Sequence, residues 1–167
     1  MAYPPQYLLS WLTCTTYMME QLYAKSGNAD LKVLHQNWEP TNDWDRQTLA
    51  LSDELVLHRD IVVSAWEHPC WFARTILPRA TYDAHLSLFE RLNQEPLGNL
   101  IFRTPAVQRL RLEHYSIETG SVEYAWVPKA IDTQQKLLWL RCSTFQVKDA
   151  ELFYLVEILL PDLEHYS

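Results

Sequence analysis

Two apolar runs of the chain each carry one ionisable residue at a position where a β-strand would bury it. Arg59 lies within residues 55–63, and Glu157 lies within residues 152–160. Side chains alternate between the two faces of a strand, and this count places both residues on the more apolar face of their segments. Arg74 shares a face with large apolar neighbours in the same way. These three charged residues are therefore the first candidates for chemistry.

The charges of these three residues do not balance. A buried charge without a partner costs several kcal/mol, so an arginine on a core face needs a carboxylate beside it. Two arginines against one glutamate leave one positive charge uncompensated, and a guanidinium group binds a carboxylate through two parallel hydrogen bonds. A small acidic ligand would complete the set. The alternative is that the three residues form a purely structural ion network.

Length and composition indicate one globular domain that covers residues 1–167. The chain is 48% hydrophobic and holds three glycines, too few for a glycine-rich phosphate loop. Its net charge is −7 and its basic residues are scattered, which argues against a nucleic-acid partner. No apolar run is long enough for a membrane span, so we expect no membrane insertion. Motifs for metal or nucleotide binding are absent from the sequence, and we expect no metal and no cofactor.

The three cysteines are Cys14, Cys70 and Cys142, an odd number without CxxC spacing. Each stands in an apolar context, so the pattern predicts reduced thiols in the core. Reduced thiols, together with the lack of a basic leader before the first apolar stretch, indicate a cytoplasmic protein.

Hydrophobic spacing predicts the elements that position these residues. Apolar residues that recur every three or four positions predict a helix from Pro5 to about Lys25, and a second over 84–93 with Asp83 as its N-cap. The expected strands cover residues 30–38, 55–63, 70–78, 100–103, 108–115, 122–127, 137–147 and 151–160. Short connections, including a turn at Lys148 and Asp149, favour an α+β fold: a single antiparallel sheet of about six strands with helices packed on one face.

Four segments of the chain, taken in order, resemble bacterial chorismate lyases. They read HRDIVV at 58–63, WFARTILP at 71–78, EPLGNLIF at 95–102 and VEILLP at 156–161. Their order and spacing agree with the family over most of the chain. The N-terminal helix is also similar, with Trp11 and Met18 at the family's spacing.

The resemblance implies a role for each candidate residue. Arg59 matches the arginine that holds the ring carboxylate, and Glu157 matches the carboxylate near the ring hydroxyl, at the opposite end of the pocket. Met18 and Leu97 match positions that line the aromatic ring or contact it through their backbone. Arg74 matches a second arginine next to the pocket, which we assign to the enolpyruvyl carboxylate. The expected catalytic residues are thus Arg59, Glu157 and Arg74.

The activity implied by the resemblance is elimination of pyruvate from chorismate to give 4-hydroxybenzoate, the first step of ubiquinone ring synthesis, without a metal or cofactor. Aromatisation of the ring supplies much of the driving force, so the protein need only hold and polarise its substrate. Proton transfer through Glu157 and intramolecular transfer to the enolpyruvyl methylene are both open routes. We expect a monomer, and the resemblance implies that the product is held beneath mobile flaps.

The chain departs from better-known members of that family at residues 118–136, a region that is longer here. It contains an expected strand at 124–126 and a polar turn at 132–135, and would extend a hairpin or form a different lid. The alternative function is a non-catalytic domain of the same fold that binds small acids, like the effector-binding domain of a family of bacterial transcription regulators.

Overall fold

The computed structural model describes residues 3–134, 136–148 and 150–167. They form one antiparallel sheet of six strands in the order β1-β2-β3-β6-β5-β4. The strands are β1 (Asp30–Pro40), β2 (Leu55–Ala65), β3 (His68–Pro78), β4 (Val107–Ile117), β5 (Leu138–Val147) and β6 (Glu151–Leu159). The predicted α+β fold with a single antiparallel sheet is confirmed. Of the two predicted turns at 132–135 and 148–149, Gln135 and Asp149 lie outside the described residues.

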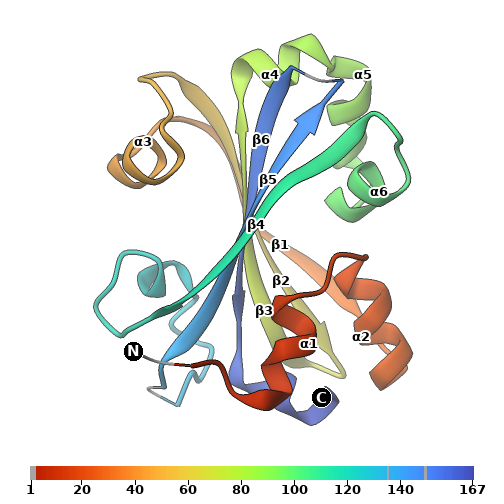
Figure 1. The fold of residues 1–167 in the computed structure, drawn as a ribbon, viewed down its shortest axis with the longest axis vertical. Coiled ribbons are helices and arrows are strands. Elements are labelled where there is room, and N and C mark those ends of the chain that lie inside the picture. The colour runs from red at the N-terminus through yellow and green to blue at the C-terminus, as the bar shows by residue number, and fades with distance from the viewer. Residues whose placement is uncertain (1–2, 135, 149) are drawn as a thin grey trace.

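Helical segments cover both faces of this sheet (Figure 1), so the prediction that they pack on one face was wrong. Most of them pack on the first face, where the apolar cores contain Trp11 and Phe153. They are η1 (Gln6–Leu8), α1 (Leu9–Leu12), α2 (Met18–Ser26), α4 (Arg79–Ala84), α5 (Leu86–Phe89), η2 (Glu90–Asn93), α6 (Leu97–Phe102) and η4 (Pro161–Tyr166). The second face is covered by α3 (Asp43–Leu49) and η3 (Tyr124–Trp126), which pack over a core around Phe72. Strands β2 and β3 are buried almost throughout because both of their faces are covered.

The predicted helix over 5–25 is interrupted between Leu12 and Met18. Its first part ends where the Thr13 hydroxyl donates a hydrogen bond to the Leu9 carbonyl oxygen, at 2.7 Å. Further β-branched threonines follow in the sequence, and such residues lose side-chain freedom in a helix. The second part, α2, ends at Gly27, whose φ of 81° is the left-handed conformation that glycine adopts readily. The segment between the two helices includes Thr16 and Tyr17, which line a cavity above the sheet.

Three other predicted elements were wrong in type or extent. Residues 100–103 are not a strand, because the α6 helix begins directly after Pro96 and covers them as far as Phe102. The segment at 124–126 is a short 3-10 helix rather than a strand. Asp83 lies inside α4 instead of capping a helix, and the expected helix over 84–93 is divided into α5 and η2.

Strand register places side chains from different strands on the same face. In the antiparallel ladders Arg59 is opposite Thr75, and Thr75 is opposite Leu155. Two residues further along, Glu157 is opposite Ala73 on one side and Arg141 on the other. These two rows both point to the first face, beneath α2 and α6. Within the described ranges, no helix is long and apolar enough to cross a bilayer.

Candidate active site

A cavity lies between the first face of the sheet and the segments that cover it. It is bounded by β-strand side chains below and by α2, α6 and the break before α2 above. Figure 1 shows α2 and α6 on the same side of the sheet. The residues that line it are Thr16, Tyr17, Met18, Met19, Leu31, Arg59, Ile61, Val63, Trp71, Ala73, Thr75, Pro96, Leu97, Gly98, Ile101, Phe102, Arg109, Arg141, Leu155 and Glu157. The wall is mostly apolar, so its few charged groups dominate the electrostatics.

Arg59 is one of these charged groups and is 3% exposed. Its Nε donates a hydrogen bond of 3.2 Å to Oε1 of Gln36 on the neighbouring strand. Its buried Nη1 has no hydrogen-bond partner among the described residues. Burial lowers the pKa of Arg59. Arg59 therefore has a desolvated N–H group that could donate a hydrogen bond to an anion in the cavity.

Glu157 and Arg141 are cross-strand neighbours on β6 and β5, and both are buried. Oε1 of Glu157 and Nε of Arg141 are 2.9 Å apart, an ion pair by distance. However, neither of these two buried atoms makes a hydrogen bond within the described chain. The Nε–H group of Arg141 therefore does not point at the Glu157 oxygen. Arg141 is held from its other end, where Nη1 donates to the Trp11 carbonyl oxygen. Glu157 thus keeps an acceptor oxygen that a ligand hydroxyl could use.

Arg109 on β4 is a third arginine of the cavity wall. Its Nη1 donates to the Thr15 carbonyl oxygen at 3.3 Å, and its guanidinium lies 5.0 Å from the ring centre of Phe145. Burial first, and then the nearby charge of Arg141, lower the pKa of Arg109. The charge of Glu157 acts in the opposite direction. Arg109 therefore lies within electrostatic reach of the Glu157 end of the cavity.

Met18 and Leu97 also line the cavity, each about 5% exposed or less. Met18 begins α2 and Leu97 begins α6, so the two helix starts meet above the sheet. Gly98 follows Leu97 and is packed against Tyr17, since a Cβ added at Gly98 would lie 2.1 Å from the Tyr17 ring. These segments form a cover over the cavity that depends on the small size of Gly98.

Arg74 does not line this cavity, and its predicted place beside the pocket is corrected. It is opposite Asp60 in the register and therefore on the second face of the sheet. There its Nε and Nη2 donate to the two carboxylate oxygens of Asp60 at 2.8 and 2.9 Å, and its guanidinium lies 4.2 Å from the Trp126 ring centre. Alternation correctly grouped Arg74 with Phe72 and Ile76, but those residues belong to the core of the second face.

Arg141 and Arg109 were missed by sequence reasoning. The signal for Arg141 was present, because Trp139, Arg141 and Phe145 fall on one face of the strand by period-two counting. Arg109 gave a weaker signal, because a register shift between Arg109 and Arg111 interrupts the alternation of β4.

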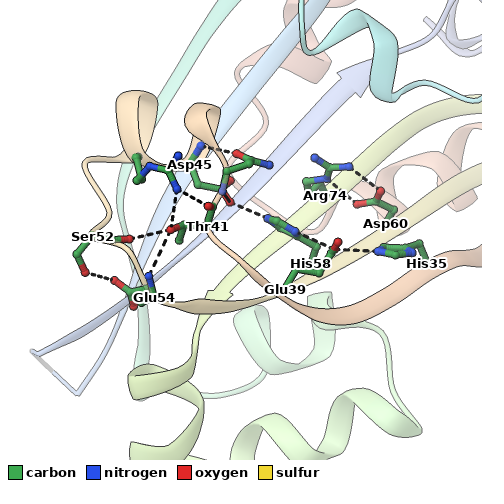
Figure 2. Close-up of polar contacts among 11 residues, drawn as sticks. His35, Glu39, Thr41, Asp45, Ser52, Glu54, His58, Asp60 and Arg74 are labelled. Atoms are coloured by element: carbon green, nitrogen blue, oxygen red, sulfur yellow. Dashed lines mark hydrogen bonds and ion pairs between the residues drawn. The ribbon is translucent and has the colours of Figure 1, made fainter.

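The second face carries a separate polar network, shown in Figure 2. His58 is 4% exposed and lies between two carboxylates: its Nδ1 is 3.0 Å from Glu39 Oε1, and its Nε2 is 2.9 Å from Asp45 Oδ2. Burial alone would lower the pKa of His58, but the hydrogen bonds and charges of these carboxylates outweigh burial and raise it. Asp45 belongs to a capping box at the start of α3, so this network ties α3 to the sheet.

The segment at 118–134, expected to extend a hairpin or form a lid, packs on this second face as well. Ile117 and Val127 belong to its core, and the Trp126 ring meets that of Trp44 edge-on at 4.8 Å between centres. The region is therefore not a lid over the cavity. In the part of the chain that the structure describes, no cluster of three or more His, Cys, Asp or Glu side chains could hold a metal ion.

Comparison with known proteins identifies a family. A sequence model described as chorismate lyase matches residues 1–163. The "Probable chorismate pyruvate-lyase" of Thiobacillus denitrificans is 26% identical over 160 residues, which cover 95% of this chain and 85% of that protein. The "Chorismate pyruvate-lyase" of Pectobacterium carotovorum is 25% identical over 127 residues, which cover 75% of this chain and 69% of that protein.

Solved structures share the fold at much lower identity. A GntR-family transcriptional regulator from Bacillus cereus has a TM-score of 0.58 at 13% identity, over 80% of this chain and 92% of that one. The C-terminal domain of the histidine utilization repressor from Pseudomonas syringae has a TM-score of 0.56 at 14% identity, over 81% of this chain and 93% of that one. These likenesses establish the fold alone.

Proposed function

Because the chain belongs to the chorismate lyase family, we propose that its cavity eliminates pyruvate from chorismate and releases 4-hydroxybenzoate. The observation that carries the proposal is the wall of the cavity. It is mostly apolar, and its charged groups are three arginines and one glutamate, which suits a ring with acidic substituents. Supply of 4-hydroxybenzoate for the ubiquinone ring belongs to the same proposal.

Arg59 is proposed to bind the ring carboxylate. Its unpartnered Nη1 and its low exposure support this role, because a charge-assisted hydrogen bond is strong where water is excluded. Arg59 and Glu157 lie on β2 and β6, with β3 between them and two residues of offset along the strands. Strand spacing then separates their Cα atoms by roughly 12 Å.

Glu157 is proposed to accept a hydrogen bond from the ring hydroxyl at C4. Met18 and Leu97 are proposed to pack on the ring and exclude water from it. In the reaction the C3–O bond breaks, the C4 proton is lost and the ring becomes aromatic. The departing enolpyruvate gains a proton on its methylene carbon and becomes pyruvate. Pre-oriented charges lower the barrier because they need no rearrangement as the negative charge moves onto the leaving oxygen.

Arg74 has no part in this proposal, because it faces the second side of the sheet with Asp60 as its partner. We further propose that the protein acts in the cytoplasm as a monomer. Burial raises the pKa of the Cys70 and Cys142 thiols to about 12, so both stay protonated and unreactive, as suits a reducing compartment.

The experiment is incubation of the purified protein with chorismate, with pyruvate and 4-hydroxybenzoate followed by chromatography. The proposal predicts equal amounts of the two products. The competing function is binding of a small acid without turnover. The reason to consider it is that the chain shares its fold with GntR-family regulators. Tight binding of 4-hydroxybenzoate with no release of pyruvate from chorismate would favour that second function.

A further inference from the structure

The charged groups of the cavity wall leave a net positive charge. Three arginines, Arg59, Arg109 and Arg141, face one carboxylate, Glu157, and the other residues of the wall are uncharged. The wall therefore carries two positive charges in excess. A monocarboxylate would neutralise one of them, whereas a dicarboxylate would neutralise both. The cavity is matched in charge to a dianion, and a second arginine besides Arg59 must meet the second carboxylate.

Arg109 is better suited to that task than Arg141. The Nε of Arg141 is already 2.9 Å from Glu157, and its Nη1 is bonded to a backbone carbonyl oxygen. Arg109 has no carboxylate within 4.0 Å in the described chain, and its buried Nε lacks a hydrogen-bond partner there. A purely structural arginine at this depth would be expected to have its donors satisfied.

The backbone near Arg109 also has an unusual form. The ladder between β4 and β5 pairs Arg109 with Phe145 and Arg111 with Thr144, so Leu110 is an extra residue. Such a bulge redirects the neighbouring side chains of a strand. Leu110 is 53% exposed, so the bulge adds nothing to the core, whereas the guanidinium of Arg109 packs over Phe145 and lines the cavity.

We propose that Arg109 binds the carboxylate of the enolpyruvyl side chain of chorismate, an inference that rests on the proposed function. The side chain is attached at C3, next to the C4 hydroxyl that Glu157 is proposed to hold. The second carboxylate must therefore lie near the Glu157 end of the cavity, away from Arg59. Arg109 shares the first face with Arg59 but lies on the edge strand β4, beyond β3, β6 and β5 from β2, and its charge interacts with those of Glu157 and Arg141.

This assignment separates substrate from product. Chorismate carries both carboxylates, whereas 4-hydroxybenzoate carries the ring carboxylate alone. When the C3–O bond breaks, the carboxylate bound to Arg109 leaves with pyruvate. Arg109 thus contributes to binding of the substrate and to the position of its leaving group, while retention of the aromatic product depends on Arg59.

The test compares Arg109→Met with Arg59→Met in two measurements: kcat/KM for chorismate and the dissociation constant of 4-hydroxybenzoate by calorimetry. Arg109→Met is expected to lower kcat/KM roughly 10- to 100-fold, the value of one charged hydrogen bond, and to leave the 4-hydroxybenzoate constant within about threefold. Arg59→Met is expected to weaken both. Arg109→Lys, which keeps the charge, should recover part of the loss. The matched control is Arg111→Met on the same strand, where Arg111 is paired with Glu113 at the surface.

The assignment would be overturned if Arg109→Met weakened the binding of 4-hydroxybenzoate by the same factor as it lowered kcat/KM for chorismate. An unchanged kcat/KM would also overturn it. Thermal unfolding of each variant identifies any loss of folding. A wild-type protein that forms no pyruvate from chorismate would refute the proposed function instead. In that case the affinities of wild type and Arg109→Met for intact chorismate, measured by calorimetry, decide the Arg109 proposal separately.

Discussion

At the scale of single residues, the site is defined by which face of the sheet each charge occupies. Arg59 and Arg74 lie on adjacent strands and differ by one position in the register, yet they belong to opposite faces. Arg74 is neutralised by Asp60, whereas Arg59 has a buried N–H without a partner among the described residues. Only the second arrangement leaves binding energy available to a ligand.

Replacement of Glu157 by glutamine tests the other end of the cavity. Glu157→Gln keeps the size of the side chain but removes its charge, so the ring hydroxyl loses a charged acceptor and Arg141 loses its counter-ion. We expect kcat/KM for chorismate to fall roughly 10- to 100-fold, measured as the initial rate of pyruvate release. Glu151→Gln, on the same strand but paired with His85 outside the cavity, is the control. Equal effects of the two substitutions would remove Glu157 from the site.

At the scale of elements, the cavity is covered where α2 and α6 begin. Tyr17 precedes α2 and stacks on Phe102 at the end of α6, with 5.4 Å between ring centres. Gly98 in α6 is in contact with the same tyrosine ring. The cover is thus formed by two short segments whose contact depends on a few side chains, and such covers open on the timescale of turnover.

Gly98→Ala is expected to loosen this cover. The added Cβ would lie 2.1 Å from the Tyr17 ring, which must move away. Overpacking of this kind costs about 1–3 kcal/mol, so affinity for 4-hydroxybenzoate should fall roughly 5- to 100-fold. Stopped-flow displacement should detect faster release of 4-hydroxybenzoate. A second substitution, Tyr17→Leu, provides space for the methyl group and should reduce the difference between glycine and alanine. Unchanged release from Gly98→Ala alone would show that this contact does not retain the product.

On the second face, His58 fixes α3 and gives the fold a pH dependence. The pKa of His58 is raised above its usual 6.5, so its contribution to stability is complete below about pH 6.5 and is lost as pH rises through the folded-state pKa. Burial raises the pKa of Glu39, but hydrogen bonds with His35 and His58 outweigh it, so the pKa is lowered. The Glu39 contribution is therefore present above about pH 4.5 and is lost in acid.

His58→Leu should destabilise the protein by about 3–5 kcal/mol, because buried Asp45 loses its cationic partner. Urea unfolding from about pH 6 to about pH 9 should give a stability that declines in the wild type and changes less in the variant. His35→Leu is the milder control, since His35 contacts the same Glu39 from a partly exposed position. A wild-type stability that is flat over this range would contradict the role given to His58.

At the scale of the whole molecule, the sequence was sufficient for the sheet and insufficient for its cover. Strands β2, β3, β5 and β6 are long, apolar and closely connected, so hydrophobic pattern predicted them well. The short helices gave weaker signals: α6 contains Leu, Ile and Phe in a run that fits a strand equally well, and tertiary packing decides between the two. The face on which Arg74 lies could not be derived either, because alternation within one strand does not fix its register with the next.

The residues of the candidate site could be selected from the sequence in part. Period-two counting and the resemblance both selected Arg59 and Glu157, and the resemblance added Met18 and Leu97, all of which line one cavity. The sequence predicted that Arg59 and Arg74 supply the excess positive charge. Arg74 is instead neutralised by Asp60 on the second face, and Arg109 and Arg141 join Arg59 in the cavity wall. Their place beside Arg59 and Glu157 depends on a bulge and on pairing across five strands, β2, β3, β6, β5 and β4, which no local pattern contains.

The most direct test of the central claim, that the cavity on the first face is the catalytic site, is a comparison of Arg59→Met with Arg74→Met. The second variant also carries Asp60→Asn, so that no carboxylate is left without its partner. The measurement is kcat/KM for chorismate. We predict a loss of roughly 100-fold for Arg59→Met and a value within about threefold of wild type for the Arg74 variant. Loss of activity in the Arg74 variant with retention in Arg59→Met would contradict the account and move the chemistry to the second face.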